Sequence, residues 1–141
     1  LGERYFRSTV AGLLAKVLWQ AGDAAEADRY CTLAEQLADP DDMDSQVLWR
    51  LTSSRLLAAT DPAGARAVAD EAVAMADTTA GLILRADALR SRAELLFELE
   101  DGPAAEASLA DAANLYERKG DVVSASALNQ RLARGAAAET R

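Results

Sequence analysis

The 141-residue sequence contains no histidine, a single cysteine and few aromatic residues: two Trp, three Tyr and two Phe. The absence of histidine excludes imidazole general bases, imidazole metal ligands and triads built on histidine. A single cysteine excludes an internal disulfide, a thiolate zinc site and an iron–sulfur cluster held by this chain alone. Acidic residues outnumber basic ones 23 to 15, for a formal net charge of −8, which disfavours direct nucleic-acid binding.

A targeting segment is also missing. The sequence starts at Leu1 without the basic start, apolar stretch and cleavage site of a signal peptide. Its longest apolar region, residues 10–19, contains Lys16 and falls short of the roughly 20 residues that span a bilayer. We therefore expect no membrane contact, and the lone cysteine favours the cytoplasm. Because the first residue is not Met, we expect the sequence to be part of a longer polypeptide.

The residues that are abundant are strong helix formers. Alanine occurs 33 times and leucine 20 times, whereas proline occurs three times. This composition predicts an all-α fold. Helical periodicity, together with Asp, Pro and Gly at the boundaries, predicts about seven helices. Their expected ranges are 3–21, 24–38, 44–59, 62–76, 80–99, 103–118 and 122–134.

Three windows of the sequence, starting at Ser8, Gln46 and Ala86, share one pattern of large and small residues. Positions four, eight and eleven of a window lie on one face of a first helix, and positions twenty and twenty-seven on one face of a second. Small residues at these last positions allow the two helices of a hairpin to approach closely. In window order, the columns are Ala11, Trp49, Leu89; Ala15, Ser53, Ala93; Leu18, Leu56, Leu96; Ala27, Ala65, Ala105; and Ala34, Ala72, Ala112.

This pattern resembles the tetratricopeptide (TPR) repeat over Ser8–Arg134. The resemblance implies a right-handed superhelix of three antiparallel helix hairpins closed by a capping helix at 122–134. One domain would then cover residues 1–134, and residues 135–141 would form a flexible tail. The windows lie 38 and 40 residues apart, longer than the usual 34. An alanine-rich bundle with a chance alignment is the alternative.

The segment Leu115–Ala125, LYERKGDVVSA, is similar to the closing segment of large actinobacterial regulators. In those proteins a helical-repeat region follows an ATPase module, with an adenylate/guanylate cyclase or DNA-binding domain elsewhere. Thirteen Arg against two Lys fit a GC-rich genome. The resemblance implies a class of parent protein and no enzymatic activity for these residues.

A superhelix of this kind would expose a concave face formed by the first helices. Cations on that face would hold the carboxylates of an acidic or C-terminal peptide, and large apolar residues would anchor a side chain. The alternative is that the apolar residues pack on neighbouring repeats and the arginines pair with local acids. The predicted partner-binding residues are Lys16, Trp19, Arg50, Ser54, Leu57, Arg90, Glu94 and Phe97.

No other chemistry is indicated. The carboxylates of residues 39–44 and 98–101 lie where helix-capping acids are expected, so we predict no metal site. Cys31 is predicted on a buried helix face with no histidine to activate it. A glycine-rich phosphate loop is absent. The sequence therefore predicts no cofactor and no catalysis by these residues.

Two classes of function remain. The first is a scaffold that binds a protein, a peptide or another domain of its parent chain. The second is a sensor that closes around a small molecule or signal peptide and controls an attached cyclase, ATPase or DNA-binding domain. A deep, partly apolar pocket on the concave face would favour the sensor, and an open charged groove would favour the scaffold.

Overall fold

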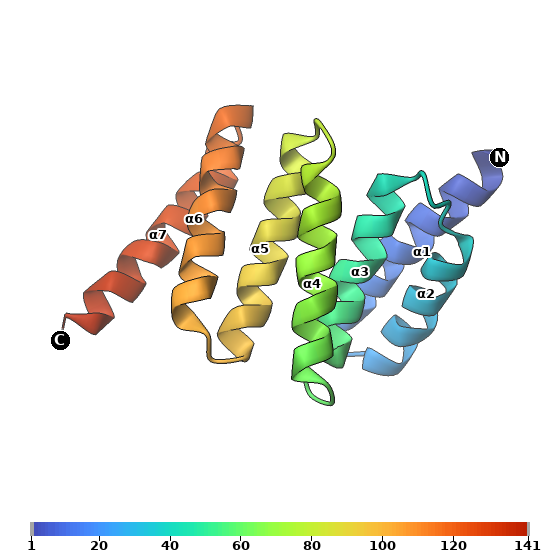
Figure 1. Cartoon of the computed structure of the whole chain (residues 1–141), viewed down its shortest axis with the longest axis horizontal. Coiled ribbons are helices and arrows are strands. Elements are labelled where there is room, and N and C mark those ends of the chain that lie inside the picture. The colour runs from blue at the N-terminus through green and yellow to red at the C-terminus, as the bar shows by residue number, and fades with distance from the viewer. Residues whose placement is uncertain (1, 141) are drawn as a thin grey trace.

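The computed structural model describes residues 2–140, which form seven α-helices and no β-strand (Figure 1). The predicted all-α class and the number of helices are confirmed for these residues. The helices are α1 (Gly2–Gln20), α2 (Ala24–Leu37), α3 (Met43–Leu57), α4 (Pro62–Asp77), α5 (Leu82–Glu98), α6 (Gly102–Lys119) and α7 (Val122–Glu139).

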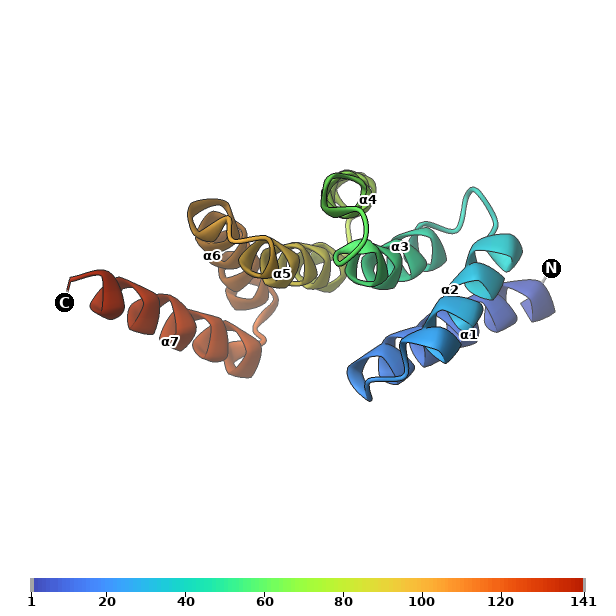
Figure 2. The same ribbon diagram turned by 90° about the horizontal axis from the view of Figure 1, so that it is seen from below.

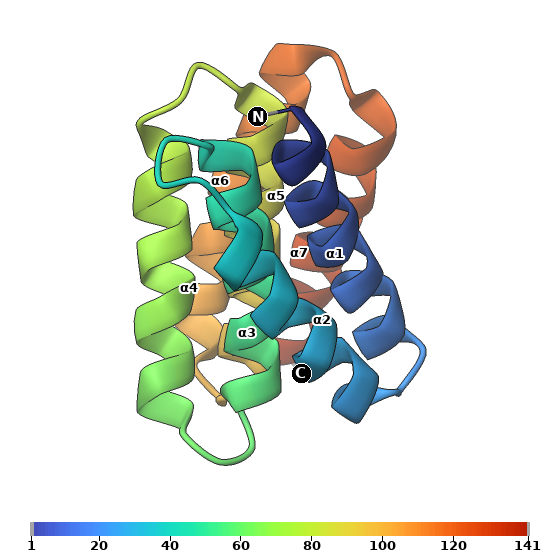
Figure 3. The ribbon, with the colours of Figure 1, turned by 90° about the vertical axis from the view of Figure 1, so that its right-hand side faces the viewer.

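Consecutive helices pack as antiparallel pairs, α1 with α2, α3 with α4 and α5 with α6. The pairs follow one another along the long axis, so that the two ends of the chain lie at opposite ends of the molecule (Figure 2). Figure 3 shows the same stack from the end formed by α1 and α2. The first helices also contact each other in sequence, α1 with α3 and α3 with α5. They therefore form one continuous layer.

Aspartate begins five of the seven helices. In each case the side-chain carboxylate accepts a hydrogen bond from a backbone N–H three residues further on, which satisfies a donor that the helix leaves unpaired. The capping residues are Asp23, Asp42, Asp61, Asp101 and Asp121. The frequent aspartates between the predicted helices thus have a structural role.

Alanine occupies the predicted small positions of the second helices. Ala27, Ala65 and Ala105 have no exposed surface, and the equivalent residues seven positions later are also buried, as predicted. Seven residues are two turns of a helix, so both alanines lie on one face. Their small side chains let the two backbones come close together.

One corner between paired helices differs from the others. Gly22, Glu100 and Gly120 adopt positive φ (88°, 61° and 86°), and each precedes a capping aspartate. At these three corners the aspartate N–H donates to a carbonyl five residues back, as in the Schellman motif. Between α3 and α4, the Asp61 N–H donates to Leu57 O, only four residues back. Thr60 is β-branched and unsuited to positive φ, so this corner lacks the left-handed residue that the other three have.

The alignment of the first helices also differs from the one expected. Buried residues recur in α1, α3 and α5 at a constant spacing of 39, as Ser8, Val47, Ala86 and as Ala15, Ser54, Ala93. The sequence alignment instead placed Ser53 with Ala15 and Ala93, and Ser53 is partly exposed. At a constant spacing of 39, Ser54 instead of Ser53 corresponds to Ala15 and Ala93, a shift of one residue or about 100° of rotation.

The last helix is longer than predicted. It extends to Glu139, so residues 135–139, expected to be part of a flexible tail, are helical. Three consecutive alanines at 136–138 favour the helix strongly. A Cβ atom on Gly135 would lie 3.0 Å from Glu106 Oε1, which shows that α7 still lies against α6 at this point. Arg141, at the end of the predicted tail, lies outside the described residues.

Candidate functional site

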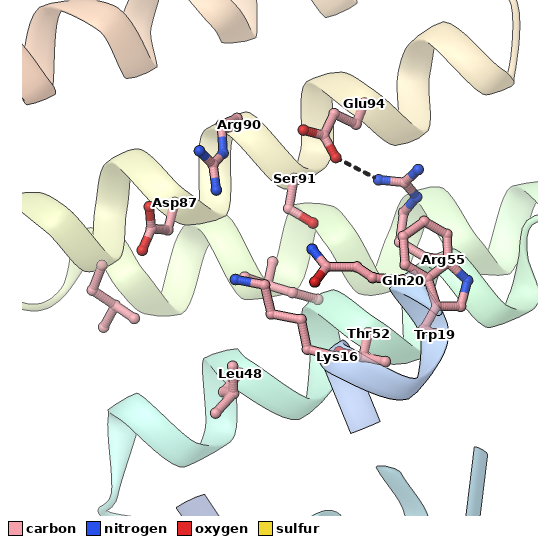
Figure 4. Close-up of a pocket in the computed structure, with 12 residues that line it drawn as sticks. Lys16, Trp19, Gln20, Leu48, Thr52, Arg55, Asp87, Arg90, Ser91 and Glu94 are labelled. Atoms are coloured by element: carbon pink, nitrogen blue, oxygen red, sulfur yellow. Dashed lines mark hydrogen bonds and ion pairs between the residues drawn. The ribbon is translucent and has the colours of Figure 1, made fainter. Parts of the chain in front are cut away.

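A small cavity of about 120 Å³ lies on the layer formed by the first helices (Figure 4). Every residue that lines it belongs to α1, α3 or α5, and none comes from a second helix. Leucines make its apolar part, and side chains of both charges make the rest. The lining residues are Lys16, Trp19, Gln20, Leu48, Leu51, Thr52, Arg55, Leu84, Asp87, Arg90, Ser91 and Glu94.

Arg55 joins the three helices around this cavity. Its side chain is 8% exposed, and its Nη1 donates to Glu94 Oε2 at 2.9 Å (Figure 4). Its Nη2 donates to Glu98, and its guanidinium lies over the Trp19 ring at 4.4 Å from the centroid. Two carboxylates and an aromatic face therefore already offset the charge of Arg55, although its buried Nε has no hydrogen-bond partner among the described residues. We assign it a structural role in holding the walls of the cavity.

Lys16 and Arg90 differ from Arg55 because neither forms an ion pair or a side-chain hydrogen bond with any residue from 2 to 140. Both are partly buried. Asp87, on the same wall as Arg90, accepts a hydrogen bond from the hydroxyl of buried Tyr116. Two cations from opposite ends of the layer thus face the cavity with donors available.

Arg90 also acts at longer range on the region where α6 meets α7. The Ser124 N–H and hydroxyl hold the pKa of the Asp121 carboxyl below its usual value, and the charge of Arg90 adds to this effect. Burial raises the pKa of Tyr116, and its hydrogen bond to Asp87 raises it further. Tyr116 therefore remains a neutral donor, and Asp87 remains engaged with it.

Four of the eight predicted partner-binding residues line the cavity: Lys16, Trp19, Arg90 and Glu94. Arg50 lies elsewhere. Its Nη1 donates to Gln46 Oε1 at 2.6 Å, its Nη2 donates to Glu71 Oε1 on α4 at 3.2 Å, and its guanidinium stacks on Trp49. The structure therefore does not bring Arg50 and Arg90 together in one groove.

The other three predicted residues contribute to packing. Ser54 is 1% exposed, and its hydroxyl donates to Leu51 O at 2.8 Å. Leu57 packs on the buried cluster that contains Ala65 and Leu95. Phe97 packs on the cluster between α5, α6 and α7, and the Arg131 guanidinium lies 4.4 Å from its ring centroid.

A one-residue shift in α3 accounts for the lining residues of that helix, which the sequence did not predict; Gln20 of α1 and Leu84, Asp87 and Ser91 of α5 were not predicted either. At a spacing of 39, Leu51 corresponds to Arg90, Thr52 to Ser91 and Arg55 to Glu94, and all six line the cavity. The available signal was the distance from the last leucine of the helix to the capping aspartate. It is four residues from Leu57 to Asp61 and five at the other two pairs.

Other candidate chemistry in the described residues is accounted for by structure. Cys31 is buried, its Sγ donates to Trp49 O at 3.2 Å, and burial raises the pKa of its thiol to about 12. The thiolate that a nucleophile requires is therefore scarce at neutral pH. Within residues 2–140 no three Cys, Asp or Glu side chains gather as metal ligands, and no helix has the length and apolarity to cross a membrane.

No protein-family model, curated protein or solved structure matches this chain. The evidence on function is therefore the geometry of the stacked helix pairs and of the cavity on their first helices.

Proposed function

We propose that this chain is a non-catalytic, TPR-like protein-interaction module that binds an acidic peptide segment on the layer of α1, α3 and α5. In this proposal the three helix pairs form a right-handed superhelix and α7 covers its C-terminal end. The stacked antiparallel pairs and the fully buried alanines at their crossings support the proposal. The recurrence of equivalent buried positions at 39 residues also supports it.

One observation carries the choice of ligand: Lys16 and Arg90 line one cavity, and neither forms an ion pair with a described residue, since Asp87 and Glu94 beside them are bonded to Tyr116 and Arg55. The chain has a net charge of −8, so two cations without an ion-pair partner give this part of the surface a positive charge that attracts an anion. Hydrogen bonds to a charged partner contribute about 1.5–3 kcal/mol each when they replace water. The neighbouring leucines and the Trp19 ring offer an apolar surface to the side chain beside the acid.

The size of the cavity favours a peptide over an enclosed small molecule. Pockets for drug-sized ligands measure about 300–1,000 Å³. A volume of about 120 Å³ suits one side chain of a segment that runs across the helices. The resemblance of Leu115–Ala125 supports the further proposal that the module belongs to a larger bacterial signalling or transcriptional regulator in the cytoplasm.

A displayed library of random peptides, selected on the wild-type chain, tests this proposal. We expect the selected peptides to contain Asp or Glu beside an apolar residue. Their affinity for the double variant Lys16→Glu/Arg90→Glu should fall by at least about tenfold, because two attractive charges become repulsive. The control is Arg29→Glu/Lys119→Glu, which changes the net charge equally on exposed residues that do not line the cavity. Failure to select acidic peptides, or equal binding by the two double variants, would contradict the proposal.

A further inference from the structure

The outer face of α1 carries a stripe of exposed apolar side chains. Phe6 is 67% exposed, Val10 43%, Leu13 49% and Val17 58%. Steps of four, three and four residues place these side chains on one side of the helix. The terminal helices of stacked arrays normally have polar outer faces, which keep them soluble. This face of α1 does not match that expectation and resembles an interior surface.

The 39-residue spacing identifies the equivalent face of α5. Two spacings after Phe6, Val10 and Val17 come Leu84, Ala88 and Leu95. Ala88 and Leu95 have no exposed surface, and all three belong to clusters formed with the preceding pair, α3–α4. The stripe on α1 thus occupies the positions at which α5 is covered by the helix pair before it.

A polar residue beside the stripe gives a second, independent observation. Arg7 corresponds to Gln46 in α3 and to Arg85 in α5. The Gln46 Nε2 donates to Asp39 O at 3.0 Å, and the Arg85 Nε donates to Asp77 Oδ1 at 3.0 Å. Both acceptors lie at the C-terminal end of the preceding second helix or just beyond it. Arg7 is exposed and has no ion pair or side-chain hydrogen bond within residues 2–140.

We propose that the outer face of α1 is a docking surface for one more helix pair, supplied by the same polypeptide upstream of this sequence. The second helix of that pair would lie on Phe6, Val10 and Val17, and its C-terminal end would accept hydrogen bonds from Arg7. The apolar stripe matches residues of α5 that pack on the preceding helix pair. Arg7 matches Gln46 and Arg85, which both donate hydrogen bonds to the end of the preceding pair. The inference uses neither Lys16 nor Arg90, so it stands or falls independently of the proposed peptide site.

The test supplies a helix pair to this face. A second copy of residues 4–42, which contain most of α1 and all of α2, is fused directly before Arg4 of residues 4–141, so that the 39-residue spacing continues. Val10→Cys in the original α1 then reports on coverage through its rate of reaction with a thiol reagent, since Cys31 is buried. Val123→Cys, on a residue 78% exposed in α7, is the matched control.

We expect the fusion to slow labelling at Val10→Cys by at least about tenfold while Val123→Cys reacts within twofold of its rate in the unfused chain. The fusion should also unfold at a higher denaturant concentration, and Phe6→Glu with Val10→Glu should abolish that increase. Equal labelling of Val10→Cys in the two proteins would overturn the proposal. It would also be overturned if the unfused chain sediments as a dimer that Val10→Glu, and not Val123→Glu, converts to a monomer, because a second copy would then cover the face.

Discussion

The middle helix pair, α3–α4, has buried alanines in its second helix as its two neighbours do, yet the backbone of its corner differs from theirs. In the neighbours, Gly22 and Glu100 adopt positive φ before the capping aspartate. In the middle pair no residue between α3 and Asp61 adopts positive φ, and the Asp61 N–H donates to Leu57 O. The alanines of the second helices are buried at the positions that the sequence alignment gives. In α3, the buried serine is Ser54, one residue after the position that the alignment gives. A different turn therefore accompanies a different set of α3 side chains at the cavity from the one expected.

The largest expected effect distinguishes the two adjacent serines of α3. Ser54→Leu should cost about 1–3 kcal/mol of the free energy of unfolding, because Ser54 is fully buried and a larger side chain overpacks the site. Ser53→Leu, at a partly exposed position, should change it by less than about 0.5 kcal/mol. Urea denaturation of both variants measures the difference. The reverse order would restore the alignment read from the sequence.

A smaller effect is expected at the corners themselves. Glu100→Gly should stabilise the protein by about 1 kcal/mol, since the left-handed conformation costs a residue with a Cβ about that much. Thr60→Gly should bring no gain and lower stability by up to about 1 kcal/mol, because φ is not positive there and glycine adds freedom to the unfolded chain. Thermal unfolding compares the two variants. A stabilising Thr60→Gly would show that the corners are alike.

The smallest effect concerns the acid that begins α6. A hydrogen bond from Arg66, followed by one from the Ala104 N–H, holds the pKa of the Asp101 carboxyl below its usual value. A lowered folded-state pKa stabilises the protein above the unfolded pKa and loses that contribution as the pH falls. Asp101→Asn should therefore lower Tm at pH 7, and the difference from wild type should shrink below about pH 4. Calorimetry from pH 7 to pH 3 measures it. A difference that is constant with pH would contradict this assignment.

Much of the fold was predictable because its signals are local. Capping aspartates, prolines at first helical positions and runs of alanine define seven helices, and alanines at fixed places identify the crossings. The alignment of α3 was not predictable from the same columns. Ser53 and Ser54 are adjacent, as are Leu56 and Leu57. The small and large columns of the other two windows therefore match α3 in either of two alignments that differ by one residue. Only the turn chemistry at Thr60 separates them.

The two possible alignments of α3 also affected the prediction of the candidate site. Of the predicted residues on α1 and α5, Lys16, Trp19, Arg90 and Glu94 line the cavity, whereas Phe97 packs against α6 and α7. Arg50, which was predicted to lie beside Arg90, instead pairs with Glu71 of α4. The length of α7 was missed for a different reason, since alanine-rich ends carry no signal that stops a helix.

Binding of one acidic peptide to two single-arginine variants tests the proposed site most directly. The peptide is the tightest one selected on the wild-type chain, and isothermal calorimetry measures its affinity for Arg90→Ala and Arg50→Ala, with folding checked by circular dichroism. Loss of a charge-assisted contact worth about 1.5–3 kcal/mol should weaken binding to Arg90→Ala by at least about tenfold. Arg50→Ala should bind within twofold of wild type, because Arg50 lies outside the cavity. Binding that Arg50→Ala weakens and Arg90→Ala preserves would contradict the site on α1, α3 and α5.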